Sequence, residues 1–232
     1  MTKLQAPILI TSCPRSGSGL VAGALELCGA FAGKVTDYSY ENIYVRNHVF
    51  CGYMKKHFMD WHGQFPLGDP GALSLRTDWR EMVENCMLEE GYSGQGAWFL
   101  NFSQIALTWP LWTHAFPNAR WVIVRRRTGD IIQSCLKTEY MDAFSKQAVQ
   151  QAVGADNERD GWLWWVNQYE KRFVDMIMSG INVKVVWPQR MVYGDYEQMM
   201  ELVDWLGLEW NTEVLNFIDP KLWKSRIAEG IL

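Results

Sequence analysis

The chain has 232 residues, of which 48% are hydrophobic and 21% charged, so it can bury a sizeable core and is not intrinsically disordered. Its 26 acidic and 22 basic residues leave a formal net charge of −4, which disfavours a globally basic nucleic-acid binder, and no nucleic-acid partner is expected. The length predicts a single domain over residues 1–232.

The cysteines and the N-terminal segment indicate a cytoplasmic protein with reduced thiols. There are five cysteines, an odd number, and none of them forms a CxxC pair. No apolar signal core precedes the first apolar run at Ile8. The most apolar helical stretch, residues 20–31, contains Glu26 and is too short to cross a bilayer, so no membrane partner is expected.

The first predicted element is a strand over residues 7–13, because PILITSC is apolar and unalternated, as in a strand buried on both faces. A helix is predicted from Leu20 to about Gly29. The loop between them reads Pro14-Arg15-Ser16-Gly17-Ser18-Gly19. Its glycines permit close approach to a ligand, and its serines add hydroxyl donors. Arg15 adds a permanent positive charge beside a helix N-terminus. The glycines, the serines, Arg15 and the helix N-terminus together predict a phosphate or sulfate site.

Spacing excludes two better-known phosphate loops. A nucleoside triphosphatase loop requires GxxxxGK[ST], whereas the Gly33-Lys34 pair has Cys28 in place of the first glycine and is followed by Val35. A tyrosine phosphatase loop counted from Cys13 would need an arginine where the chain has Gly19. A simple turn remains the alternative interpretation of PRSGSG taken alone.

Strands and helices alternate along the rest of the chain. Helices are predicted over 41–61 and 78–90, with an exposed Gly- and Pro-rich loop at 63–75 between them. A strand over 97–102, a Trp-rich helix ending at Phe116, a strand over 120–124 and a helix over 128–140 follow. The polar stretch 147–160 is interpreted as a mobile segment, before a helix over 161–179, a strand over 181–187 and a helix over 195–206. This order predicts an α/β fold with a mostly parallel sheet flanked by helices.

A second anion site is predicted at the end of the strand 120–124, which leads directly into three arginines. Strand alternation turns Arg126 away from Arg125 and Arg127, which are interpreted as a solvated strand end. Ser134 lies eight residues after Arg126, in the second turn of the next helix. Ligands of open α/β sheets bind at the carboxyl ends of the strands, so Arg126 and Ser134 could close on one anion beside the first loop.

Three segments, in this order, resemble sulfotransferases. CPRSGSG resembles their 5′-phosphosulfate loop, P-[KR]-S-G-T-T. The segment 126–134 resembles their 3′-phosphate motif R-N-P-x-D-x-x-x-S through Arg126, Asp130 and Ser134, although Arg127 and Thr128 replace Asn-Pro. The segment 192–208 resembles their late YE-x-L … LGL segment, so the similarity extends over roughly residues 7–210.

The resemblance implies a P-loop-like three-layer fold and transfer of a sulfuryl group from 3′-phosphoadenosine 5′-phosphosulfate (PAPS) to an acceptor hydroxyl or amine. PAPS would be the co-substrate, with a small molecule or carbohydrate as acceptor. The implied 5′-phosphosulfate residues are Arg15, Ser16, Gly17, Ser18 and Gly19, and the implied 3′-phosphate residues are Arg126 and Ser134. Arg15 would also neutralise the leaving phosphate during transfer.

The resemblance further implies a general base. Many relatives use a glutamate shortly after the second strand, and Glu41 occupies the comparable place, where a helix N-terminus would stabilise its anion. His48, about two turns further on, is the reserve candidate. An ordinary first-turn glutamate is the alternative interpretation of Glu41.

Three departures bear on activity. Asn101 and Phe102 stand where many relatives carry a lysine at the end of the third strand, and Arg125, Lys221, Lys224 and Arg226 are the cations that could replace it. Leu20 replaces the aromatic residue that stacks on adenine. The C-terminal RKGxxGDW-type segment is absent, and KLWKSRIAEG is only loosely similar to it.

Other functions therefore stay open. The chain could bind adenosine bisphosphate without catalysis, or, less in keeping with the absent GK[ST], act as a nucleotide kinase. No metal is expected, because His48, His57, Asp60 and His62 lack a recognised ligand spacing. The tryptophans are interpreted as core first and as an acceptor pocket second, with Trp162 and Trp165 on one helix face and Trp164 elsewhere.

Overall fold

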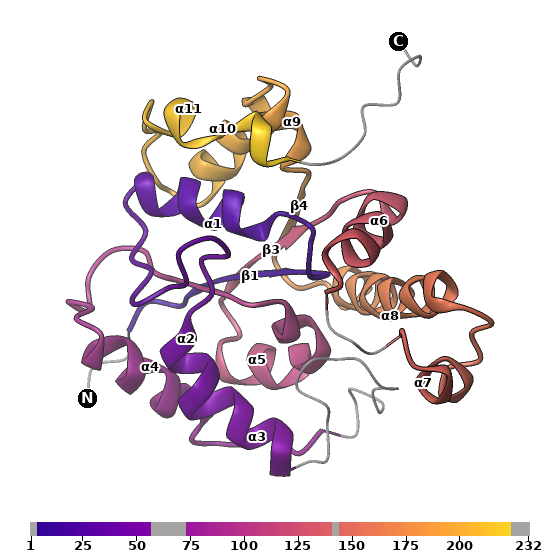
Figure 1. Cartoon of the computed structure of the whole chain (residues 1–232). Helices are drawn as coiled ribbons and strands as arrows, with labels where there is room; N and C mark the ends of the chain where they lie inside the picture. The colour runs from indigo at the N-terminus through magenta and orange to yellow at the C-terminus, as the bar shows by residue number, and fades with distance from the viewer. Residues whose placement is uncertain (1–3, 57–72, 141–143, 224–232) are drawn as a thin grey trace.

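The fold is built on a four-stranded sheet in the order β2-β1-β3-β4, seen in a computed structural model that describes residues 4–56, 73–140 and 144–223 (Figure 1). The strands are β1 (Ile8–Ser12), β2 (Phe99–Asn101), β3 (Arg120–Val124) and β4 (Val183–Val186). All three neighbouring pairs are parallel. Ser12 pairs with Val124 at the last position of the β1–β3 ladder, so the loops after these two strands leave the sheet side by side.

Helices and short helical turns connect the strands. Before β2 these are α1 (Ser18–Leu27), α2 (Ile43–Val45), a π-helical turn (Arg46–Phe50), α3 (Cys51–Lys56) and α4 (Trp79–Glu89). Between β2 and β4 they are a 3₁₀ turn (Ser103–Thr108), α5 (Trp109–Ala115), α6 (Thr128–Thr138), α7 (Gln147–Ala152) and α8 (Glu158–Met178). After β4 they are α9 (Gln189–Val192), α10 (Glu197–Trp205), α11 (Val214–Phe217) and a final 3₁₀ turn (Pro220–Leu222).

Two hydrophobic cores cover the two faces of the sheet. In β1, Leu9 belongs to the core under α3, α4, α5 and α8, whereas Ile8 and Ile10 belong to the core under α1 and α10. All five residues of β1 are buried, which explains why its sequence is continuously apolar rather than alternating. The predicted α/β class, a mostly parallel sheet with helices on both faces, is confirmed.

Some predicted elements differ from those observed. The stretch 147–160, predicted to be mobile, contains α7 and the start of α8; Asn157 caps α8 by accepting a hydrogen bond from the backbone N–H of Asp160 at 3.0 Å. The helix predicted over 41–61 is divided by the π-helical turn. Its end, with His57, Asp60 and His62, and most of the loop 63–75 lie outside the described residues. No described helix has both the length and the apolar character needed to cross a membrane.

Candidate functional site

Two backbone hydrogen bonds and two residues with positive φ shape the loop after β1. The backbone N–H of Ser16 donates to the carbonyl oxygen of Cys13 at 3.2 Å, and that of Leu20 donates to Gly17 at 3.1 Å. Gly17 lies at φ +86°, which glycine adopts readily, and Arg15 lies at φ +72°, which is uncommon for a residue with a side chain. The chain thereby turns sharply into α1, whose first residue is Ser18.

Contacts of Arg15 join this loop to the residues that follow β3. The Nη1 of Arg126 donates to the carbonyl oxygen of Arg15 at 2.8 Å. The Nε of Arg15 donates to the Oγ of Ser134, in α6, at 3.1 Å. Arg126 and Ser134 therefore both contact the same loop residue, and the pairing of Ser12 with Val124 places their segments beside that loop.

The other two arginines of the triplet point elsewhere. Arg125 forms an ion pair with Glu170 of α8, and its guanidinium lies 5.2 Å from the centre of the Trp187 ring system. Arg127 pairs with Asp130 at 3.0 Å, one turn along α6. Only the middle arginine of the three faces the loop after β1, in agreement with strand alternation.

Arg126 is buried to 9% exposure. Burial lowers its pKa, the charge of Arg15 lowers it further, and Asp130 partly opposes both effects. An arginine remains protonated in proteins, so the site keeps two neighbouring positive charges, one of them largely desolvated. Such an arrangement favours an anion with several oxygens.

Burial raises the pKa of Cys135, which follows Ser134, to about 12, and it raises the pKa of the buried Cys13 as well. Neither thiol is therefore set up as a nucleophile, since the thiolate is the reactive form. This agrees with the sequence argument against a cysteine phosphatase.

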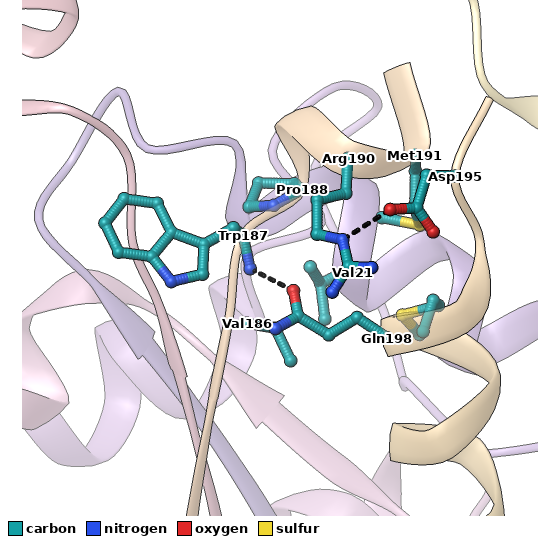
Figure 2. Close-up of a pocket in the computed structure, with 9 residues that line it drawn as sticks. Val21, Val186, Trp187, Pro188, Arg190, Met191, Asp195 and Gln198 are labelled. Atoms are coloured by element: carbon teal, nitrogen blue, oxygen red, sulfur yellow. Dashed lines mark hydrogen bonds and ion pairs between the residues drawn. The ribbon is translucent and has the colours of Figure 1, made fainter. Parts of the chain in front are cut away.

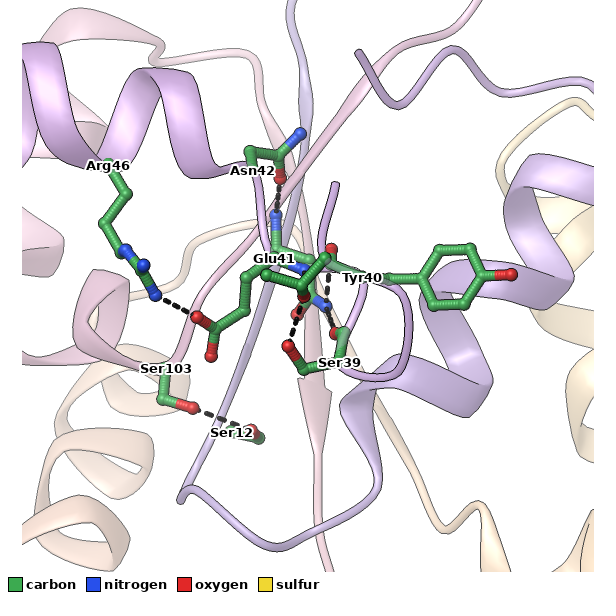
Figure 3. Close-up of polar contacts among 9 residues, drawn as sticks. Ser12, Ser39, Tyr40, Glu41, Asn42, Arg46 and Ser103 are labelled. Carbon is green, nitrogen blue, oxygen red and sulfur yellow. Dashed lines mark hydrogen bonds and ion pairs between the residues drawn. The ribbon is translucent and has the colours of Figure 1, made fainter. Parts of the chain in front are cut away.

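A turn at residues 36–41 packs on the N-terminus of α1. A Cβ added at Gly19 would lie 2.6 Å from the carbonyl oxygen of Tyr38, so only glycine permits this approach. The backbone N–H of Glu41 donates to the Oγ1 of Thr36 at 3.1 Å, which closes the turn. The backbone N–H of Asn42 donates to the carbonyl oxygen of Asn101 at the end of β2, so Glu41 lies at the edge of the sheet where the parallel strand β1 also ends; Figure 3 shows Glu41 with Asn42 and Ser12.

Glu41 forms an ion pair with Arg46, and both side chains are largely buried, at 25% and 20% exposure. Burial raises the pKa of Glu41, although the charge of Arg46 and its hydrogen bond oppose the effect. The pKa of Glu41 is therefore not lowered as expected at a helix terminus, because desolvation is the larger effect. A carboxylate with a raised pKa is a stronger base than an exposed one.

Asn101, which replaces the lysine of the resemblance, is fully buried at the end of β2. Its Nδ2 donates to the carbonyl oxygens of Ser39 and Tyr40, at 2.8 and 3.1 Å. Its backbone N–H donates to the Oδ1 of Asn42 at 2.5 Å. Asn101 therefore supports the turn that carries Glu41 and supplies no charge.

The cations proposed to replace that lysine are arranged differently. Arg125 is paired with Glu170, and the backbone N–H of Lys221 donates to Asp219 at 2.9 Å in the final 3₁₀ turn. Lys224 and Arg226 lie outside the described residues. Arg46, which the sequence analysis did not select, is the cation that contacts Glu41. Its position five residues after Glu41 was the available signal.

The reserve base and the residue at the adenine-stacking position pack locally. The Nδ1 of His48 lies 3.0 Å from the carbonyl oxygen of Tyr44, and the two rings are 3.9 Å apart. Tyr44 in turn donates to Glu89 of α4 at 2.7 Å, so this group lies along α4 and not on the loop after β1. Leu20 packs on the core beneath α1.

Tyr140 is a residue of this region that the sequence analysis missed. The guanidinium of Arg15 lies 5.5 Å from the centre of its ring. Burial raises the pKa of Tyr140, and the charge of Glu41 raises it further, so the phenol stays protonated. Trp162 and Trp165, at 6.2 and 6.3 Å from the Tyr140 ring, are fully buried, and they form the core rather than an open pocket.

A small cavity lies beside the loop, between the start of α1 and helices α9 and α10 (Figure 2). It is lined by Val21, Trp187, Pro188 and Met191 among others, and has a volume of about 10 Å³. That volume holds about one water molecule, so this cavity does not accommodate a nucleobase. Within the described ranges, no group of three His, Cys, Asp or Glu side chains is placed to hold a metal ion.

Comparison with known proteins identifies the architecture. The crystal structure of sulfotransferase STF9 from Mycobacterium avium is similar to this chain with a TM-score of 0.56 and 11% sequence identity, over 93% of this chain and 67% of that one. Neither the protein-family models nor the curated proteins match the sequence. The chain therefore has a sulfotransferase-like α/β fold, with a four-stranded parallel sheet flanked by helices.

Proposed function

We propose that this protein is a sulfotransferase that moves a sulfuryl group from PAPS to an acceptor hydroxyl or amine. The observation that carries the proposal is the joining of two predicted anion sites through Arg15, which accepts from Arg126 and donates to Ser134. A doubly phosphorylated nucleotide has two anionic ends, and adjacent sites at two neighbouring strand ends suit such a ligand.

The loop after β1 would hold the 5′-phosphosulfate. Its donors would be the backbone N–H groups at the start of α1, the hydroxyls of Ser16 and Ser18, and Arg15. Arg126 and Ser134 would hold the 3′-phosphate. Preorganised donors of this kind stabilise charge that builds on the leaving phosphate, and removal of one typically costs on the order of 10²–10³ in kcat.

Glu41 is the proposed general base. It would accept the proton of the acceptor hydroxyl as the acceptor oxygen bonds to sulfur, while the bond from sulfur to the 5′-phosphate oxygen breaks and adenosine 3′,5′-bisphosphate leaves. The electron pair of the broken bond stays on that phosphate, beside Arg15. The raised pKa of Glu41 favours proton acceptance, and the charge and hydrogen bond of Arg46 favour the carboxylate form that a base needs.

One observation favours a second function. Asn101 carries no charge and is committed to the turn 36–41, so the chain could bind adenosine bisphosphate without transferring sulfate. Both functions require the same two anion sites, and they differ only in turnover.

Thermal unfolding in the presence of nucleotides tests the proposal. Adenosine 3′,5′-bisphosphate is expected to raise Tm more than ATP with magnesium does, because the loop lacks the GK[ST] sequence of a triphosphate site. A preference for ATP would contradict the proposal. Stabilisation by the bisphosphate without sulfate transfer to a panel of alcohols, sugars and amines would favour the binding function.

Two variants separate binding from catalysis. Arg126→Ala is expected to weaken adenosine 3′,5′-bisphosphate much more than adenosine 5′-monophosphate, and equal losses would place the 3′-phosphate elsewhere. Glu41→Gln is expected to keep bisphosphate affinity and lose turnover. An active Glu41→Gln variant would remove Glu41 from the mechanism.

A further inference from the structure

Trp223, just after the final 3₁₀ turn, packs directly against the two anion-binding segments. The guanidinium carbon of Arg126 lies 4.3 Å from the centre of the Trp223 ring system. On the other segment, a Cβ added at Gly17 would lie 2.7 Å from the Cζ3 of Trp223. One side chain from the C-terminal part of the fold thus contacts both the loop after β1 and the end of β3.

The stacking orients Arg126 without using its hydrogen-bonding groups. A cation over an aromatic ring is attracted to the ring face, whereas the N–H groups of a guanidinium project within its plane. One of those groups already donates to the carbonyl oxygen of Arg15. The carbonyl oxygen of Arg15 and the indole ring of Trp223 therefore both hold the guanidinium of Arg126 in place before any anion binds.

The indole N–H of Trp223 provides a second observation. It is buried and has no hydrogen-bond partner among the described residues. The N–H groups of Trp79, Trp109 and Trp165 share this property, but Trp79 and Trp165 lie inside the apolar core and Trp109 packs against it. Trp223 differs because a buried cation and a phosphate-type loop adjoin it. The unpaired, buried N–H of Trp223 is explained if it donates a hydrogen bond to an anion bound beside Arg126.

We propose that Trp223 is part of the 3′-phosphate site: its ring positions Arg126, and its N–H donates to a phosphate oxygen. This inference rests on the proposed function, since it assigns the anion at Arg126 to the 3′-phosphate of an adenosine bisphosphate. It makes Trp223 a determinant of selectivity for nucleotides phosphorylated at the 3′ position.

Calorimetric titration with adenosine 3′,5′-bisphosphate and adenosine 5′-monophosphate tests the assignment. Trp223→Ala is expected to weaken the bisphosphate about 30-fold, corresponding to about 2 kcal/mol for a desolvated cation–π contact, and to leave the monophosphate within about threefold. Trp223→Phe keeps a ring but has no N–H, so a loss of roughly 3- to 10-fold is expected.

Trp205→Phe is the matched control, because Trp205 also lies near a cation, Lys184 at 5.5 Å, but belongs to α10. It is expected to keep the selectivity of the unmodified protein. Thermal unfolding without nucleotide shows whether each variant is folded. If Trp223→Ala does not fold, the comparison of Trp223→Phe with the unmodified protein provides the test.

The outcomes separate this inference from the proposed function. If the unmodified chain does not prefer the bisphosphate, the proposed function fails and the inference fails with it. If that preference exists and both Trp223 variants retain it in full, only the role of Trp223 is refuted. Tighter bisphosphate binding by Trp223→Ala would also refute it, because the indole would then compete with the nucleotide for Arg126.

Discussion

Asn101 offers the sharpest test of how the fold holds the proposed base. Asn101→Ala removes the two hydrogen bonds that its side chain donates to the carbonyl oxygens of Ser39 and Tyr40. At roughly 0.5–1.5 kcal/mol for each net hydrogen bond, the free energy of unfolding is expected to fall by about 1–3 kcal/mol. The backbone bond from Asn101 to Asn42 does not depend on the side chain and remains, so β2 itself is expected to persist.

Asn101→Asp adds a test with a defined sign. A buried carboxylate facing two carbonyl oxygens has a pKa raised above the ordinary value of about 3.9, so the variant is expected to lose stability as the pH rises through that raised pKa. Below it, the neutral acid can still donate one hydrogen bond. Urea unfolding at several pH values measures both effects.

Asn47→Ala is the matched control for both Asn101 variants, because Asn47 is exposed in the π-helical turn. Its effect is expected to stay within about 0.5 kcal/mol. Loss of turnover in Asn101→Ala with unchanged bisphosphate affinity would link the turn to Glu41. An Asn101→Ala variant as stable as the Asn47→Ala control would refute the assigned support of the turn.

Two further predictions concern packing and pH. Gly23→Ala is expected to lower the free energy of unfolding by about 1–3 kcal/mol, because the new Cβ would lie 2.3 Å from the Cζ of Phe217. Gly52 has open space around it, so Gly52→Ala is expected to raise the free energy of unfolding by about 0.5–1 kcal/mol. If both variants changed this free energy in the same direction in urea unfolding, the packing argument would be contradicted. Arg46 lowers the pKa of Glu41, so Arg46→Met is expected to move the acidic limb of the kcat–pH profile to higher pH. An unmoved limb would exclude Glu41 as the titrating base.

Burial of Glu41 also predicts a pH dependence of stability. Its pKa is raised above the ordinary 4.5, so the stability present below that value is lost as the pH rises through the raised pKa. Glu41→Gln should remove this loss in urea unfolding. A Gln variant with the same pH dependence as the unmodified chain would contradict the raised pKa.

Local sequence was sufficient to predict those elements whose structure depends on the burial or backbone geometry of a few neighbouring residues. The strands 7–13 and 120–124 were predictable because a strand covered on both faces must be continuously apolar. The stretch 147–160 was predicted wrongly, because its polarity outweighed the helix-forming composition of QAVQQA and the cap at Asn157. Partly buried Val149 and Val153 pack this segment on the core, which polarity alone does not reveal.

The sequence by itself determined the α/β order of elements, the Gly- and Ser-rich composition of the loop 14–19 and the separation of Arg126 from its neighbours, because each depends on residues close together in the chain. Only the tertiary structure decided that the pKa of Glu41 is raised, that Asn101 supports the turn, and that Trp223 meets Arg126 and Gly17. The last two depend on strand register and on the path of the chain across the sheet. The first depends on desolvation, which no short stretch of sequence encodes.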